Sequence, residues 1–130
     1  ILALPIIESG YQNLAQSSHA GWGAGLWMFI ERTAQNYGLR VDSSVDERLN
    51  VEMETDAAMR YLVSNHARFD DWILAVFAYN IGENTLQAAI EKFGTRDPWI
   101  LIRNNIENDK GYIPKLMAAI LILNNPQYIR

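Results

Sequence analysis

The sequence predicts an all-α fold, or nearly so, built as a compact bundle of short helices. Two observations predict it: apolar residues recur at helical spacing in several segments, and no stretch alternates apolar and polar residues as a half-buried strand does. The 130 residues are enough for one domain, so we expect a single domain over residues 1–130. Because the chain opens inside an apolar segment and without methionine, we also expect it to be a piece of a longer protein.

The N-terminal segment should form a short buried helix followed by a long loop. Residues 1–8 are apolar on almost every side and stop at Ser9-Gly10, which is typical of a helix ended by glycine. Pro5 fits such a helix only in its first turn or at a kink. Residues 11–25 are rich in glycine, serine, asparagine and glutamine, and loops of that length are often functional.

The middle of the chain should contain two helices separated by a polar turn. Residues 26–37 are predicted to be helical, and residues 41–50 are polar and turn-like. Residues 51–69 form the next predicted helix, because their apolar positions recur at helical spacing. The apolar face of this helix consists of Met53, Ala57, Ala58, Tyr61 and Leu62.

Helix signals are also clear in the second half. Asp70-Asp71 is suited to cap a helix over residues 72–79, since aspartate side chains accept hydrogen bonds from the first free N–H groups. Residues 84–93 form a further predicted helix, closed by Gly94. Asp97-Pro98 opens a short helical piece, with proline at a permitted first-turn position.

The C-terminal segment is the most apolar part of the chain. Residues 113–123 are apolar nearly all round, so we expect a central buried helix around which the others pack. The longest unbroken apolar run, Leu116–Leu123, is far shorter than the roughly 20 residues that a membrane helix needs, so no transmembrane segment is expected. Residues 1–7 lack the basic start of a signal peptide.

Composition excludes several classes of function. The formal net charge is -4 and no basic run exists, which argues against nucleic-acid binding. The chain has no cysteine, so thiol chemistry and thiolate zinc sites are excluded. Its two histidines, His19 and His66, are far apart and lack a ligand-like partner at i+4 spacing. We therefore expect no metal site and no cofactor.

Glu8 is the residue that best suits catalysis. A carboxylic acid at the end of an apolar helix, beside a glycine-rich loop, is suited to the floor of a cleft, where burial raises its pKa. A carboxyl group still protonated near neutral pH can donate a proton to a glycosidic oxygen. On residue type alone, a solvent-exposed glutamate at a helix end is the commoner case.

Five motifs in order along the chain decide between these interpretations of Glu8. The first is Glu8–Tyr11, which reads ESGY; the second is Gly25–Phe29, which reads GLWMF. The others are Val45–Arg48 (VDER), Ala78–Asn80 with Gly82 (AYN-G), and Tyr112–Lys115 (YIPK). Together they resemble the lytic transglycosylase family related to goose-type lysozyme, and within it the membrane-bound D-type branch. The resemblance covers nearly the whole chain and implies a lysozyme-like bundle with a substrate cleft.

The resemblance also implies a mechanism and a setting. Glu8 would protonate the oxygen that links N-acetylmuramic acid to N-acetylglucosamine in peptidoglycan glycan strands. It would then act as a base on the muramic acid 6-hydroxyl, which closes a 1,6-anhydro ring without consuming water. No second carboxylate is needed, unlike in most glycosidases. The location implied is the bacterial cell envelope, on the periplasmic side, with any outer-membrane anchor preceding residue 1.

The resemblance assigns supporting roles to further residues, each with a structural alternative. Tyr79 would line the cleft, or be a core aromatic; Asn80 would bind sugar, or cap its helix, which we favour. Tyr112 would hold the Glu8 carboxyl by a hydrogen bond, or simply pack. Ser17 would lie near the reacting sugar, or be a solvated loop serine. Of two tryptophans considered as sugar platforms, Trp27 is expected in the core and Trp22 is the better candidate for exposure.

Two departures from the family pattern fall beside the expected cleft. Met28 stands where the family usually has glutamine, and methionine is a poor hydrogen-bonding partner for a sugar. The loop Ser18–Ala24 is two residues longer than usual. Two alternatives therefore remain open: a lysozyme-like hydrolase, which needs a second carboxylate such as Asp42, Asp46 or Glu47, and a non-catalytic peptidoglycan-binding domain.

Overall fold

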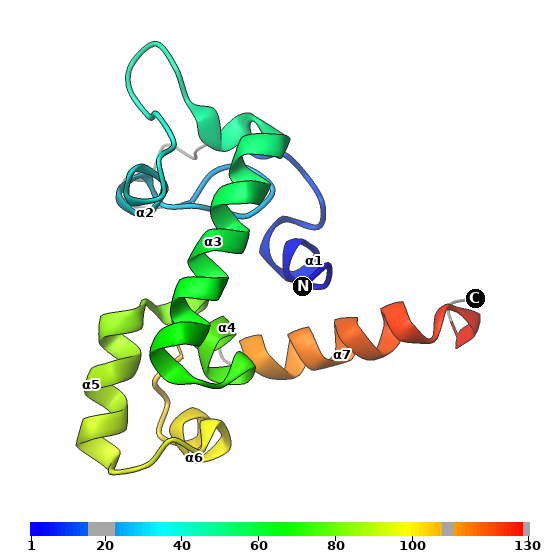
Figure 1. Ribbon diagram of the computed structural model, residues 1–130. Helices are drawn as coiled ribbons and strands as arrows, with labels where there is room; N and C mark the ends of the chain where they lie inside the picture. Colours follow the sequence, from blue (N-terminus) through cyan, green and yellow to red (C-terminus); the bar gives the residue numbers. More distant parts are fainter. Residues whose placement is uncertain (16–22, 108–110, 129–130) are drawn as a thin grey trace. The chain divides into compact units, whose positions relative to one another are not determined.

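A computed structural model describes residues 1–15, 23–107 and 111–128 of the chain (Figure 1). In these residues the regular structure consists of seven α-helices and two short 3₁₀ helices, with no strand. Backbone pairing of the β type is limited there to isolated bridges, such as Leu14 with Gly25. The all-α prediction is confirmed for the described residues. None of the helices in these ranges is long and apolar enough to cross a membrane.

The chain divides into two compact units. The first comprises Ile1–Arg60 with Leu116–Arg130, and the second comprises Tyr61–Lys115. The long helix α3 (Val51–Phe69) and the C-terminal helix α7 (Tyr112–Asn124) each contribute to both units. Each unit is described by itself below.

The first unit begins with α1 (Leu4–Ser9), which confirms the predicted short helix. Pro5 lies in its first turn, where the missing N–H costs nothing. Gly10 ends the helix with φ 62°, a left-handed conformation that glycine adopts without a Cβ penalty. The N–H of Gly10 donates to the carbonyl of Ile6, and that of Tyr11 donates to the carbonyl of Pro5, both at 3.1 Å.

The predicted helix over residues 26–37 is wrong in its first half. The helix α2 spans only Glu31–Asn36, and residues 24–29 form a tight turn closed by a 3.0 Å bond from the N–H of Ala24 to the carbonyl of Phe29. Met28 has φ 52°, which no α-helix accommodates. A Cβ on Gly23 would lie 2.0 Å from the carbonyl oxygen of Met28, so the turn also needs glycine beside it.

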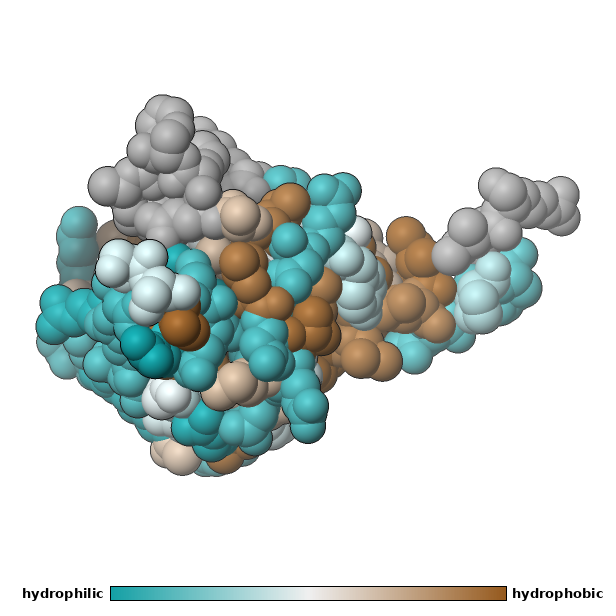
Figure 2. All heavy atoms as spheres, turned by 90° about the horizontal axis from the view of Figure 1, so that it is seen from above, coloured by the Kyte–Doolittle hydropathy of each residue, from teal (hydrophilic) through white to brown (hydrophobic). Residues whose placement is uncertain are grey.

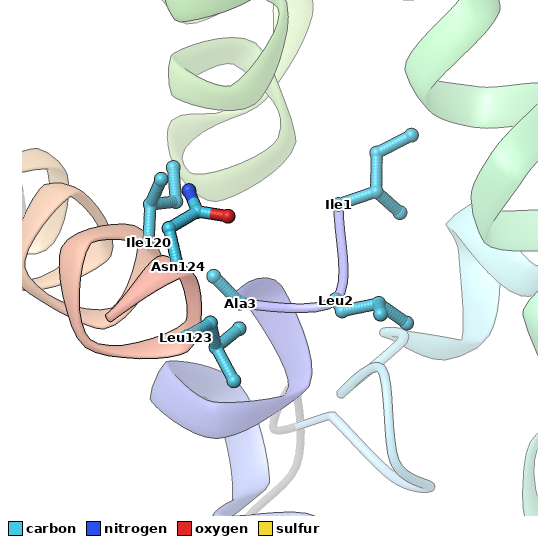
Figure 3. Close-up of a pocket in the computed structure, with 6 residues that line it drawn as sticks. All are labelled: Ile1, Leu2, Ala3, Ile120, Leu123 and Asn124. Carbon is cyan, nitrogen blue, oxygen red and sulfur yellow. The ribbon is translucent and has the colours of Figure 1, made fainter. Parts of the chain in front are cut away.

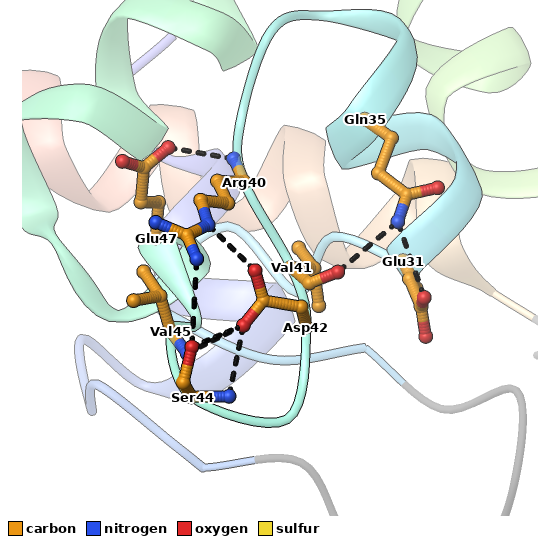
Figure 4. A network of polar contacts seen from close by, with 8 residues as sticks. All are labelled: Glu31, Gln35, Arg40, Val41, Asp42, Ser44, Val45 and Glu47. Atoms are coloured by element: carbon orange, nitrogen blue, oxygen red, sulfur yellow. Dashed lines mark hydrogen bonds and ion pairs between the residues drawn. The ribbon is translucent and has the colours of Figure 1, made fainter.

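The polar turn over residues 41–50 is confirmed, and it is organised by Asp42 (Figure 4). Oδ1 of Asp42 accepts bonds from the N–H and hydroxyl of Ser44 at 2.8 and 2.7 Å, and Oδ2 accepts a 2.5 Å bond from Arg40. Glu47 accepts from the N–H of Arg40 at 2.6 Å. The 3₁₀ helix η1 (Glu47–Leu49) closes the segment.

Helix α3 has the predicted bounds but not the complete predicted apolar face. Ala57, Ala58, Tyr61 and Leu62 are buried, as expected. Met53 is 38% exposed, however, and the carboxylate residue Glu54 is fully buried in its place. The correction matters for the site because Glu54 binds the turn described above.

The second unit contains three further helices, close to the predicted positions. They are α4 (Trp72–Ile81), α5 (Glu83–Phe93) and α6 (Pro98–Arg103). Asp71 caps α4 as predicted, accepting a 2.9 Å bond from the N–H of Leu74. Gly94 ends α5 in the left-handed conformation, and Asp97 caps α6.

Helix α7 corrects the expectation of a buried C-terminal helix. Tyr112, Ile113, Leu116 and Ala119 form one buried stripe at helical spacing. The remaining apolar side chains are exposed, with Leu121 at 63% and Ile122 at 49%. Figure 2 shows apolar side chains at the surface of the segment that leads to the C-terminus. A helix that is apolar on every side is fully buried only if other elements cover every side. The described residues cover one side of α7.

Candidate functional site

Glu8 lies in the last turn of α1 and its side chain is half-buried. The neighbouring Ser9 is tied to the turn over residues 24–29, since its hydroxyl donates to the carbonyl of Leu26 at 2.8 Å. The same hydroxyl lies 3.2 Å from the carbonyl of Pro5, one helical turn back. The end of α1 and the turn that carries Met28 are therefore joined next to Glu8.

The turn over residues 24–29 is held from within by Glu54 of α3. Oε1 of Glu54 accepts from the N–H of Leu26 at 3.0 Å, and Oε2 accepts from the N–H of Trp27 at 3.2 Å. Burial raises the pKa of Glu54, and the negative charge of Asp46 raises it further, while the two N–H bonds lower it. The side chain is fully buried, so these two bonds satisfy a group that is costly to leave unpaired.

Arg48 holds the other end of the same turn. Its guanidinium donates to the carbonyl of Phe29 at 3.1 Å and to Asp46 at 2.8 and 2.7 Å. These bonds from Arg48 are the main reason that the pKa of Asp46 is lowered. The arginine side chain is itself buried, which fits a paired, hydrogen-bonded charge.

The predicted interpretation of Trp27 as a core residue is confirmed, since it is 2% exposed and its indole N–H donates to Thr55 at 2.9 Å. Met28 is half-buried in the turn between the points that Glu54 and Arg48 hold. The sequence analysis singled out Met28 but missed Glu54. A signal was available, because Glu54 precedes Ala57 and Ala58 by three and four residues and thus lies on the apolar face of its helix.

In the second unit, Tyr79 and Asn80 lie near the C-terminal end of α4. Tyr79 is half-buried, and its ring centroid lies 5.2 Å from that of Tyr61. The hydroxyl of Tyr61 donates to Glu83 at 2.8 Å, at the start of α5. This arrangement holds the Tyr79 ring beside a second aromatic ring, at an interplanar angle of 39°.

Asn80 does not cap α4, which corrects the interpretation that we favoured. The residue lies inside the helix, and Gly82 ends it by donating its N–H to the carbonyl of Ala78 at 2.8 Å. Oδ1 of Asn80 is a buried acceptor for which the described part of the chain shows no hydrogen-bond partner. Buried polar atoms are rarely left unpaired, so this oxygen is suited to a ligand or water donor.

Tyr112 is the first residue of α7 and is 4% exposed. The start of this helix is held by Glu107, whose carboxylate accepts from the N–H groups of Gly111 and Ile113 at 2.9 and 3.4 Å. Glu107 is 8% exposed and precedes the helix, so it serves as an anionic cap. The expected hydrogen bond from Tyr112 to Glu8 joins residues of different units and stays a prediction.

Some predicted features lie outside the described residues. They are Ser17, Trp22 and most of the loop Ser18–Ala24. Within the described residues, no group of three or more histidine, aspartate and glutamate side chains is placed to hold a metal ion. His66 is partly buried and stacks on Trp72 with ring centroids 4.0 Å apart.

A pocket of about 330 Å³ lies elsewhere in the first unit (Figure 3). It is lined by Ile1, Leu2, Ala3, Ile120, Leu123 and Asn124. Five of the six lining residues are apolar, and none of the described predicted site residues belongs to the lining. This pocket is therefore separate from the residues assigned to catalysis.

Comparison with known proteins gives these residues a family context. Residues 1–102 match the family described as the Transglycosylase SLT domain. The chain belongs to the SLT transglycosylase family. The matched region of this SLT domain contains Glu8, Met28, Tyr79 and Asn80, and Tyr112 lies beyond it. The resemblance inferred from the five motifs is confirmed.

Two of the individual relatives of this SLT domain are named as transglycosylases. Membrane-bound lytic murein transglycosylase D of Escherichia coli K12 is 36% identical over 130 residues, which cover 96% of this chain and 28% of that protein. A putative tributyltin chloride resistance protein of Alteromonas sp. strain M-1 is 28% identical, over 95% of this chain and 60% of its own length. Peptidoglycan transglycosylase gp16 of Escherichia phage T7 is 42% identical over 64 residues, 48% of this chain and 5% of gp16.

Proposed function

We propose that this SLT domain is a peptidoglycan lytic transglycosylase with Glu8 as its general acid and base. The family assignment supports the class of reaction, as do the names of two relatives. The observation that carries the choice of residue is the position of Glu8, half-buried in the last turn of α1 and next to the Ser9–Leu26 bond. A partly desolvated carboxyl group at a defined position suits proton transfer.

The reaction has two proton transfers at one carboxyl group. Glu8 donates its proton to the glycosidic oxygen between N-acetylmuramic acid and N-acetylglucosamine, and the bond from that oxygen to the anomeric carbon breaks. The resulting Glu8 carboxylate takes the proton of the muramic acid 6-hydroxyl, whose oxygen bonds to the anomeric carbon. Glu8 ends as it began, and the product carries a 1,6-anhydro ring.

The other predicted residues have binding or positioning roles in this proposal. Tyr79 offers a ring face to a sugar, which suits its half-buried position on the Tyr61 ring. The unpaired buried Oδ1 of Asn80 accepts a hydrogen bond from substrate. Tyr112 holds the Glu8 carboxyl group, Ser17 lies near the reacting sugar, and Met28 contacts the glycan through its apolar side chain.

The substrate implies the location and the partner. Peptidoglycan glycan strands lie in the bacterial cell envelope, so we propose that the domain acts there, on the periplasmic side. One relative carries "membrane-bound" in its name, but this chain spans 28% of that protein. We propose no anchor from the chain itself.

The test is a digest of purified peptidoglycan sacculi by the unchanged protein and by Glu8→Gln, with products identified by mass spectrometry. We expect 1,6-anhydromuropeptides from the unchanged protein and none from Glu8→Gln, while Glu52→Gln, an exposed carboxylate of α3, keeps the activity. Reducing-end products would instead show a hydrolase. Binding to sacculi without any release would show a non-catalytic binding domain.

The hydrolase alternative needs a second carboxylate, for which Asp42, Asp46 and Glu47 are the candidates. Asp42 accepts hydrogen bonds from Ser44 and Arg40. Asp46 accepts from the guanidinium of Arg48, and Glu47 accepts from the backbone N–H of Arg40. These contacts stabilise the loop over residues 40–48 itself. They favour the transglycosylase, which needs no second carboxylate.

A further inference from the structure

We propose that Glu54 is a positioning residue for Glu8, acting through Leu26 and Ser9. The inference rests on the proposed function, because it assigns a role in the reaction of Glu8. All four residues belong to the first unit. Glu54 touches neither a reacting atom nor the substrate in this proposal, and its effect passes through the backbone of one turn.

The first step is the clamp that Glu54 makes on two successive peptide groups. Its two oxygens each accept one N–H, at 3.0 Å from Leu26 and 3.2 Å from Trp27. A carboxyl group offers an oxygen acceptor in both positions, whereas a glutamine amide replaces one acceptor with a donor. Since the side chain is fully buried, water does not replace a lost bond without local opening.

The second step is the absence of free space around the clamp. A Cβ on Gly25 would lie 2.1 Å from Oε2 of Glu54 and 2.0 Å from the carbonyl oxygen of Arg48. Arg48 meanwhile bonds to the carbonyl of Phe29 and to Asp46. The turn over residues 24–29 is therefore held at Leu26 and Trp27 and again at Phe29 by side chains of opposite charge.

The third step passes from the clamp to the catalytic helix. Leu26 donates its N–H to Glu54 and accepts the Ser9 hydroxyl on its carbonyl at 2.8 Å. A shift of Leu26 would move or break the Ser9 bond, and Ser9 directly follows Glu8 in the last turn of α1. The end of this six-residue helix is also closed by the backbone bonds of Gly10 and Tyr11.

The consequence concerns rate more than binding. A small misplacement of a proton-transfer group can cost up to about a hundredfold in rate, because the reacting atoms must be closely aligned. Loss of the clamp should therefore lower kcat for glycan cleavage. The KM should change less than kcat, because Glu54 itself makes no contact with the substrate in this proposal.

The experiment compares Glu54→Gln with Glu52→Gln, two identical changes on the same helix of which only the first alters the clamp. Steady-state rates of 1,6-anhydro product formation are measured on soluble glycan strands, well below the melting temperature of each variant. Hydrogen–deuterium exchange by mass spectrometry reports the backbone over residues 24–29. The set is completed by Ser9→Ala and by the double variant of Glu54→Gln with Ser9→Ala.

We expect Glu54→Gln to lower kcat by about tenfold or more, with KM within about twofold of the unchanged protein. Hydrogen–deuterium exchange should quicken over residues 24–29 only. A variant that merely destabilised the fold would show faster exchange throughout the protein. The double variant should lose no more activity than the more impaired single variant, because both changes cut the same connection.

Three other results would overturn the proposal in different ways. If Glu54→Gln and Glu52→Gln have equal kcat while the unchanged protein forms anhydro product, the positioning role is wrong and the proposed function stands. If the unchanged protein forms no anhydro product, the proposed function fails and the positioning role fails with it. Multiplicative losses in the double variant would show that Glu54 does not act through Ser9.

Discussion

Gly25 and Glu54 approach each other so closely that a Cβ on Gly25 would lie 2.1 Å from the carboxylate oxygen of Glu54. The same Cβ would lie 2.0 Å from the carbonyl oxygen of Arg48, and Gly25 has φ 81°. Residue 25 is thus constrained by conformation and by space together. The buried carboxylate of α3 meets the turn at its one residue without a side chain.

The first prediction concerns this contact. Gly25→Ala should destabilise the fold by about 3 kcal/mol or more, because positive φ strain of about 1 kcal/mol adds to the displacement of Glu54 or Arg48. The control is Gly38→Ala, since Gly38 has φ 84° but nothing within 4 Å of its Cβ position. Urea unfolding measures both. Equal losses would show that strain alone explains the glycine.

The second prediction concerns the pH dependence of stability at Glu54. Burial raises its pKa above the ordinary value of 4.5, so the folded protein holds this proton at a pH at which the unfolded chain has released it. The contribution of Glu54 to the free energy of unfolding therefore falls as pH rises from about 4.5 through the folded pKa. Glu54→Gln should remove that decline, and Glu52→Gln should keep it. The free energy of unfolding of both variants is measured at a series of pH values. The same pH dependence in the two variants would contradict this prediction.

The third prediction concerns Asp42, whose pKa is lowered from 3.8 to about 2, chiefly by the side-chain bond from Ser44. Ser44→Ala should raise this pKa towards 3.8, as measured by NMR titration of the Asp42 carboxyl carbon. The stability that Asp42 contributes is present above about 3.8 and is lost as pH falls towards 2. Ser43→Ala is the matched control. An unchanged titration of Asp42 in Ser44→Ala would assign the shift to the backbone N–H of residue 44 and to Arg40 instead.

The fourth prediction tests the exposure of α7. Leu116 is 7% exposed and Leu121 is 63% exposed on the same helix. Leu116→Ala should cost about 2–3 kcal/mol, because it leaves a cavity, whereas Leu121→Ala should cost about 0.5 kcal/mol or less. Thermal or urea unfolding of the two variants decides the point. Comparable losses would mean that Leu121 is covered in the folded protein.

Much of the helical structure follows from residues that act locally. Gly10 and Gly94 end helices because glycine adopts the left-handed conformation freely, and Asp71 begins one because its own side chain accepts a nearby N–H. Pro5 has its fixed φ and no N–H, so it suits a first turn and no other part of a short helix. The motifs around Glu8 and Tyr79 are likewise continuous in sequence, which is why the family was identified from them.

Where local signals were silent, the sequence-based interpretation was wrong. Residues 26–30 were expected to be helical, yet residues 24–29 form a turn, in which Met28 has φ 52° and Glu54, some 28 positions from Leu26, accepts two of the N–H groups. Asn80 looked like a cap, yet α4 continues past it to Gly82. These outcomes depend on partners that no window of sequence contains.

By itself, therefore, the sequence determined the all-α class, most helix ends, the family and the identity of Glu8 as the candidate catalytic residue. The tertiary structure alone decided that Glu54 is buried against the turn over residues 24–29 and that α7 is covered on one stripe. The physical reason is the distance along the chain over which each kind of interaction acts. Backbone preference and capping act within a few residues, whereas burial and the hydrogen bonds of a buried charge depend on which distant segments pack together.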